Sequence, residues 1–93
     1  MTSHNVYTLS NVTATRLTPN GIHSGMDITL QNINDSGYIY VGAENVSSSS
    51  FGFRIAPNAA LSFELPGSND LYAISENNEM LLAKLEIGLE VGN

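Results

Sequence analysis

The stretch Tyr38–Ser75 decides the fold class, and it reads YIYVGAENVSSSSFGFRIAPNAALSFELPGSNDLYAIS. In its middle, Leu61, Phe63 and Leu65 point to one side of an extended chain, while the polar residues between them point to the other side. Clusters of Gly, Pro, Asn, Asp and Ser separate such segments, and these residues favour turns. The pattern predicts an all-β protein.

Two segments of this stretch, Tyr38–Gly42 and Leu71–Ser75, are apolar on both faces. A strand that is covered on both sides lies in the centre of a sheet or at an interface. The simplest role of the aromatic residues is the core, but this apolar surface exceeds what one sandwich core needs, and Tyr is enriched at interfaces. We therefore predict five interface residues, which are Tyr38, Tyr40, Phe51, Phe53 and Tyr72.

The same alternation continues on the N-terminal side of the stretch. Residues 25–32 (GMDITLQN) place apolar side chains on one face only, which predicts a half-buried strand. Residues 5–9 and 12–18 are two weak strands, and Asn20–Gly21 marks the turn after them. The polar N-terminus, Met1–Ser10, is either a frayed terminus or an extended arm that adds a strand to a neighbouring sheet edge.

The C-terminal segment fits two secondary structures. Its leucines partly match helical spacing, but Ala83, Leu85, Ile87, Leu89 and Val91 alternate with charged residues or glycine. Because Gly88 inside a helix would cost about 1 kcal/mol, we favour a strand. The total of about eight strands predicts a single small β-sandwich or jelly-roll-like barrel that comprises residues 1–93.

The composition excludes several classes of function. A net charge of −6 with only three basic residues, Arg16, Arg54 and Lys84, excludes the basic patch that nucleic acid or an anionic membrane surface requires. The chain has no cysteine, hence no disulfide framework, and we see neither a secretory signal nor a membrane span. A chain of 93 residues buries a small core, so its stability as a monomer is modest, and small domains commonly gain stability by oligomerisation.

Catalytic and metal-binding groups are scarce. Only His4, His23 and the serines could move protons or attack near neutral pH, and no catalytic motif surrounds them, so we predict no enzyme activity and no cofactor. The acids that could bind Ca²⁺ lack the spacing of a calcium loop and suit turns better, so we predict no metal site; they are Asp35, Asp70, Glu76 and Glu79. Ser47–Ser50 is either a flexible connection or a contact with a neighbouring subunit.

The central stretch resembles the recurring segment of small tailed-bacteriophage virion proteins. That segment combines an aromatic-Val-Gly strand, a Val-Ser loop, a Gly-hydrophobe pair, a Pro-centred turn, an alternating strand and a Leu-Tyr-Ala-Ile strand. The matching residues are Tyr40, Val41, Gly42, Val46, Ser47, Gly52, Phe53, Pro57, Leu61, Leu71, Tyr72, Ala73 and Ile74. The match covers a little under half of the chain, and Met1–Gln31 departs from the pattern.

The resemblance implies a β-rich protein that decorates a phage head, made in the host cytoplasm and located on the capsid surface. It also implies a homo-oligomer, with a trimer favoured, whose partner is the major capsid protein. The alternative is a carbohydrate- or host-binding module of a head or tail fibre, with Tyr38, Tyr40 and Tyr72 as the sugar-binding aromatics.

Overall fold

The computed structural model describes residues 2–18, 25–67 and 69–88, and these residues form strands and connections without a helix. The eight strands are β1 (Thr2–Leu9), β2 (Thr15–Arg16), β3 (Met26–Asn32), β4 (Ile39–Gly42), β5 (Phe53–Ile55), β6 (Ala60–Leu65), β7 (Tyr72–Ser75) and β8 (Met80–Gly88). The predicted all-β fold class is therefore confirmed.

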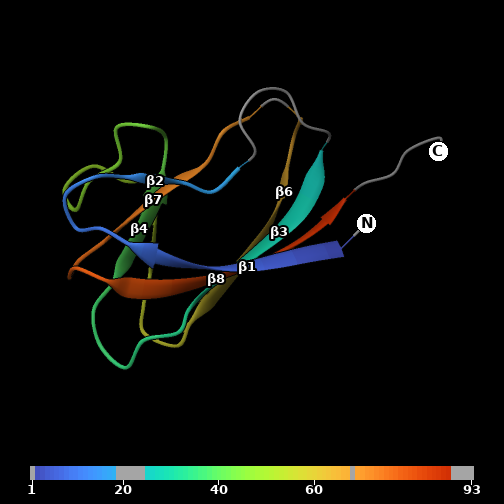
Figure 1. Cartoon of the computed structure of the whole chain (residues 1–93). Coiled ribbons are helices and arrows are strands. Elements are labelled where there is room, and N and C mark those ends of the chain that lie inside the picture. Colours follow the sequence, from blue (N-terminus) through green and yellow to red (C-terminus); the bar gives the residue numbers. More distant parts are fainter. Residues whose placement is uncertain (1, 19–24, 68, 89–93) are drawn as a thin grey trace.

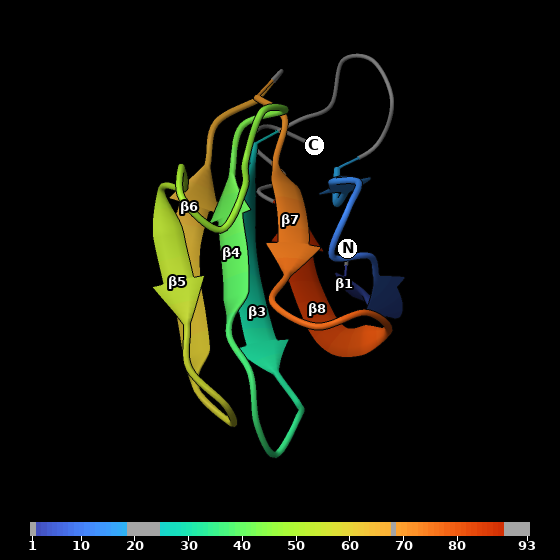
Figure 2. The same ribbon diagram turned by 90° about the vertical axis from the view of Figure 1, so that its left-hand side faces the viewer.

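The strands form two antiparallel sheets of four, which face each other (Figures 1 and 2). The first sheet has the order β1-β8-β3-β6, and the second has the order β2-β7-β4-β5. Every connection except the one between β4 and β5 crosses from one sheet to the other. This order is the topology of a jelly roll, a double-sheet fold of eight strands.

The structure bears on three of the predictions for single segments, which concern the C-terminal segment, the N-terminal residues and the second weak strand. The C-terminal segment is a strand as far as Gly88, because β8 pairs with β1 on one side and with β3 on the other, while Leu89 and Val91 lie outside the described residues. The N-terminal residues are paired with β8 from Thr2 to Leu9, so an extended arm would require β1 to leave this sheet. The second weak strand is reduced to Thr15–Arg16, while the turn at Asn20–Gly21 lies outside the described residues.

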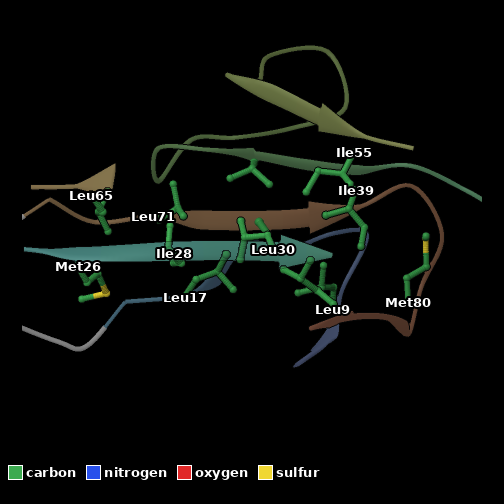
Figure 3. Packing of buried hydrophobic residues seen from close by; sticks show 13 residues of the cluster. Leu9, Leu17, Met26, Ile28, Leu30, Ile39, Ile55, Leu65, Leu71 and Met80 are labelled. Carbon is green, nitrogen blue, oxygen red and sulfur yellow. The ribbon is translucent and has the colours of Figure 1, made fainter. Parts of the chain in front are cut away.

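The core lies between the two sheets and consists almost entirely of aliphatic side chains (Figure 3). Alternate residues of β3 point into it, and Leu30 at the middle of that strand is fully buried. The core residues are Leu9, Leu17, Met26, Ile28, Leu30, Ile39, Val41, Ile55, Leu65, Leu71, Ala73, Met80 and Leu82. Burial of these side chains is the main favourable term in the stability of the domain.

One polar side chain, Asn32, is fully buried at the end of β3. Its Nδ2 donates hydrogen bonds to the carbonyl oxygens of Gly37 at 2.9 Å and Ile55 at 3.0 Å. Its Oδ1 accepts hydrogen bonds from the backbone N–H and the side-chain amide of Asn34. The Asn34 side chain in turn exchanges two hydrogen bonds with the backbone of Leu81. This network joins the ends of β3, β5 and β8.

The turn that leads into β4 needs a glycine at position 37. Gly37 has a φ of 90°, and a Cβ added there would lie 2.9 Å from Nδ2 of Asn77 and 3.0 Å from the Sδ of Met80. We expect Gly37→Ala to lower the free energy of unfolding by about 2 kcal/mol, as measured by urea denaturation. Gly52→Ala is the matched control with an expected loss below about 1 kcal/mol, because its Cβ would lie 3.4 Å from the nearest atom. Equal losses in the two variants would contradict this account.

Candidate interaction surface

Strand β8 turns its alternating apolar residues away from the core. An alternating strand usually buries its apolar side chains and exposes its polar ones. In β8 the buried side chains are Met80, Leu82 and Lys84, whereas Leu81, Leu85 and Ile87 are exposed. The strand thus presents an apolar row to the outside of the molecule.

The buried Lys84 explains how the core tolerates this orientation. Its Nζ donates a hydrogen bond to the carbonyl oxygen of Leu17 at 2.6 Å and lies 3.2 Å from Oε1 of Glu86. It also lies 5.3 Å from the centre of the Tyr7 ring, within the range of a cation–π interaction. The charge therefore has partners inside the sandwich, and the side chain as a whole is only 3% exposed.

The exposed row of β8 continues onto β1. Val6 is 59% exposed and lies directly opposite Ala83 in the register of the two strands. We call the outward-facing set Val6, Leu81, Ala83, Leu85 and Ile87 the apolar face. Among the described residues eight large hydrophobic side chains are exposed, and four of them belong to this face.

Polar residues border the apolar face on both sides. His4 lies opposite Leu85 on β1, and Thr29 and Gln31 lie on β3. A shallow hollow of about 250 Å³ lies over this region, lined by His4, Asn5, Val6, Thr29, Gln31, Ala83, Lys84 and Leu85. An apolar centre with a polar rim is the usual anatomy of a protein–protein interface.

One end of the same sheet face is acidic. Asp27 and Glu64 are directly opposite each other on β3 and β6, and both are exposed. They line a hollow of about 360 Å³ together with Ile87, Thr29 and Ser62, and the last two share a hydrogen bond of 2.8 Å. Like charges in directly opposite positions destabilise a sheet, so a cation from a partner would relieve this repulsion.

The predicted interface residues lie on the other sheet or near its edge. Tyr40 is only 7% exposed, because Val46 packs beside it and the Phe51 ring lies 4.9 Å away. Tyr38 and Tyr72 are half-buried, and the guanidinium of an arginine lies over each ring. The connection between β4 and β5 thus covers part of the outer apolar surface of β4 and β7. The role of the five predicted interface residues in binding stays a prediction.

Phe53 opens onto a second apolar feature. This side chain is 51% exposed and lines a slot of about 280 Å³ between the two sheets. Residues of both edge strands β5 and β6 line the slot, and no polar side chain is among them; they are Val41, Gly42, Gly52, Phe53, Leu61, Phe63 and Leu71. Sequence alternation cannot find such a slot, because its walls come from distant segments.

The polar candidates are dispersed or have structural contacts. Ser47 and Ser50 close a tight turn through two backbone hydrogen bonds of 2.7 and 3.2 Å, so this run is an ordered hairpin turn. Asp70 pairs with Arg16 at 2.7 Å, and Glu76 accepts a hydrogen bond from the Tyr38 backbone.

Metal-ligating side chains are dispersed over the part of the chain that the structure describes. The described residues contain no cluster of three or more metal-ligating side chains, and His23 lies outside them. The described part of the chain also contains no helix that is long and apolar enough to cross a bilayer.

Comparison of the chain with protein families, with curated proteins and with solved structures gives no match.

Proposed function

We propose that the protein is a non-enzymatic structural protein of a bacteriophage virion, which binds the head shell as a decoration protein and stabilises it. The apolar face carries this proposal, because exposed apolar side chains that gather on one face of a small domain mark an interaction site. The proposal includes the capsid surface as the location, the major capsid protein as the partner and self-association as a homo-oligomer, with a trimer favoured.

The chemistry of the apolar face suits a protein partner. Its centre is aliphatic, and the charged groups on the same sheet face, Asp27 and Glu64, lie at one end. Burial of such a surface contributes about 25 cal/mol per Å² of apolar area, offset by the freedom of motion lost on binding. A shell that presents many identical sites adds avidity to each contact.

The fold is compatible with this role and with the carbohydrate-binding alternative, because jelly rolls occur both in viral capsid domains and in lectins. The sugar-binding hypothesis needs tyrosine rings that are open to solvent. Tyr40 is buried, and Arg54 lies 4.5 Å from the centre of the Tyr38 ring. The exposed aliphatic surface therefore favours the decoration role over the alternative.

The proposed function is tested by binding to undecorated heads of the virus that encodes the chain. We expect the purified protein to co-sediment with the heads, and Leu85→Glu to weaken binding at least about tenfold, because it places a carboxylate in the centre of the apolar face. Leu85 points to solvent, so circular dichroism should show an unchanged fold.

The matched control is Ala56→Glu, which places the same carboxylate at an exposed position on the connection between β5 and β6, outside the apolar face. This variant should bind the heads as the wild type does. Failure of the wild-type protein to bind would refute the decoration role, and equal binding by Leu85→Glu would refute the role of the apolar face.

A further inference from the structure

Val12 is the most exposed large hydrophobic residue in the described part of the chain, at 82%. It lies on the connection between β1 and β2. Ser10 holds this connection, because its Oγ accepts hydrogen bonds from the backbone N–H groups of Val12 at 2.9 Å and Thr13 at 3.1 Å. The backbone carbonyl of Ser10 also accepts a hydrogen bond from Ser75 N–H. Val12 is thus an exposed apolar side chain on a connection that hydrogen bonds hold in place, and we call it the knob.

The slot between β5 and β6, which we call the hole, is apolar and large enough to receive an aliphatic side chain. Its volume of about 280 Å³ is roughly twice that of the engineered cavity, about 150 Å³, that binds benzene in another protein. The inward side chains of the edge strands, including Phe53 and Phe63, stay partly exposed there. An aliphatic side chain would fit the slot chemically, whereas a charged or polar group would find no hydrogen-bond partner among the lining side chains.

The knob and the hole lie at opposite edges of the sandwich. Strands β1 and β2 form one edge of the two sheets, and β5 and β6 form the other edge. Figure 2 shows β5 and β6 on the left and the blue N-terminal segment on the right. Val12 therefore cannot reach the slot of its own chain, but a second copy can present its Val12 to it.

We propose that Val12 of one copy inserts into the slot of the next copy, which joins the molecules head to tail. Such a contact uses two different patches, so repeated contacts close a ring if the rotation permits and otherwise form a filament. Asn11 and Thr13 are exposed and would form a polar rim around the buried valine. The inference rests on the self-association within the proposed function, and it uses a different surface from the apolar face.

The test is the mass of the purified full chain by sedimentation equilibrium over a wide range of concentration. We expect the wild type to self-associate and Val12→Ser to weaken the association at least about tenfold. Val6→Ser is the matched control, because it removes an exposed valine from the apolar face and leaves the knob intact. Both positions are exposed, so thermal melting should show unchanged stability.

Mixing two variants tests the head-to-tail geometry directly. Phe53→Asp blocks the slot and keeps the knob, whereas Val12→Ser removes the knob and keeps the slot. Each variant alone should stay monomeric, and an equimolar mixture should form heterodimers but nothing larger, because only one intact contact is possible. Head binding by Val12→Ser is measured in parallel and reports on the apolar face alone.

A monomeric wild type, unchanged association of Val12→Ser, or a mixture that stays monomeric would each overturn the inference. Loss of self-association with intact head binding would leave the decoration role standing. Loss of head binding in the wild type with intact self-association would refute that role and leave the contact standing.

Discussion

Replacing Asn32 by Ala should lower the free energy of unfolding by about 3 to 5 kcal/mol, because the carbonyl groups of Ile55, which is buried, and Gly37, which is half-buried, lose their donor. The Asn32 amide donates to Gly37 and Ile55, and its oxygen accepts from Asn34. Each unsatisfied buried polar group costs about 1 to 3 kcal/mol. The loss also removes the link between the ends of β3, β5 and β8. Urea denaturation followed by circular dichroism measures the effect.

The neighbouring variant Gln31→Ala is the matched control. Gln31 lies on the same strand but is exposed, so its loss should stay within about 0.5 kcal/mol. Asn32→Asp keeps the size of the side chain and replaces the donor with an oxygen that faces the two carbonyl groups. It should destabilise at least as strongly as Asn32→Ala. A mild effect of Asn32→Asp would mean that volume, not hydrogen bonding, determines the role of this residue.

Replacing Lys84 by Ala should lower the free energy of unfolding by about 2 to 4 kcal/mol. The substitution removes the aliphatic stem from the core and leaves the Glu86 carboxylate, whose side chain is only 17% exposed, without its cation. The carbonyl of Leu17 would keep only the weaker hydrogen bond from the Tyr7 hydroxyl, at 3.4 Å. Urea denaturation followed by circular dichroism measures this loss as well.

A double variant separates the charge from the packing. Lys84→Met with Glu86→Gln keeps apolar volume at position 84 and removes both charges, so its stability should return to within about 1 kcal/mol of the wild type. Ala83→Ser, on the outward face of the same strand, is the control and should change little. If the double variant were as unstable as Lys84→Ala, the ion pair itself would be the stabilising element.

Much of the fold could be predicted because its strands are short and regularly patterned. The alternation of Leu61, Phe63 and Leu65 indicated which side of β6 faces the core, and Leu65 is indeed buried. The segments that are apolar on both faces became β4 and β7, the central strands of their sheet. The length of β1 was underestimated, because its first residues gain order from pairing with β8 and not from their own propensity.

The candidate site was harder to predict, because the apolar side of an alternating strand is usually, but not always, the side that is buried. In β8 the side that carries Lys84 faces inward, since Leu17 and Glu86 supply partners for the ammonium group. Because the Lys84 side of β8 faces inward, the apolar side chains on the other side of this strand face outward and form part of the apolar face. In sheet β2-β7-β4-β5 the outward apolar side chain of Tyr40 is instead buried, because the connection after β4 covers it with Val46 and Phe51.

The sequence by itself determined the class of the fold, the number of strands and the absence of a basic patch or a cysteine framework, because these depend on local patterning and composition. The tertiary structure alone decided the rest: which side of β8 faces solvent, how Asn32 joins three strands, and that Val12 and the slot lie at opposite edges. These features depend on contacts between residues that are far apart in the chain, and no local period encodes them.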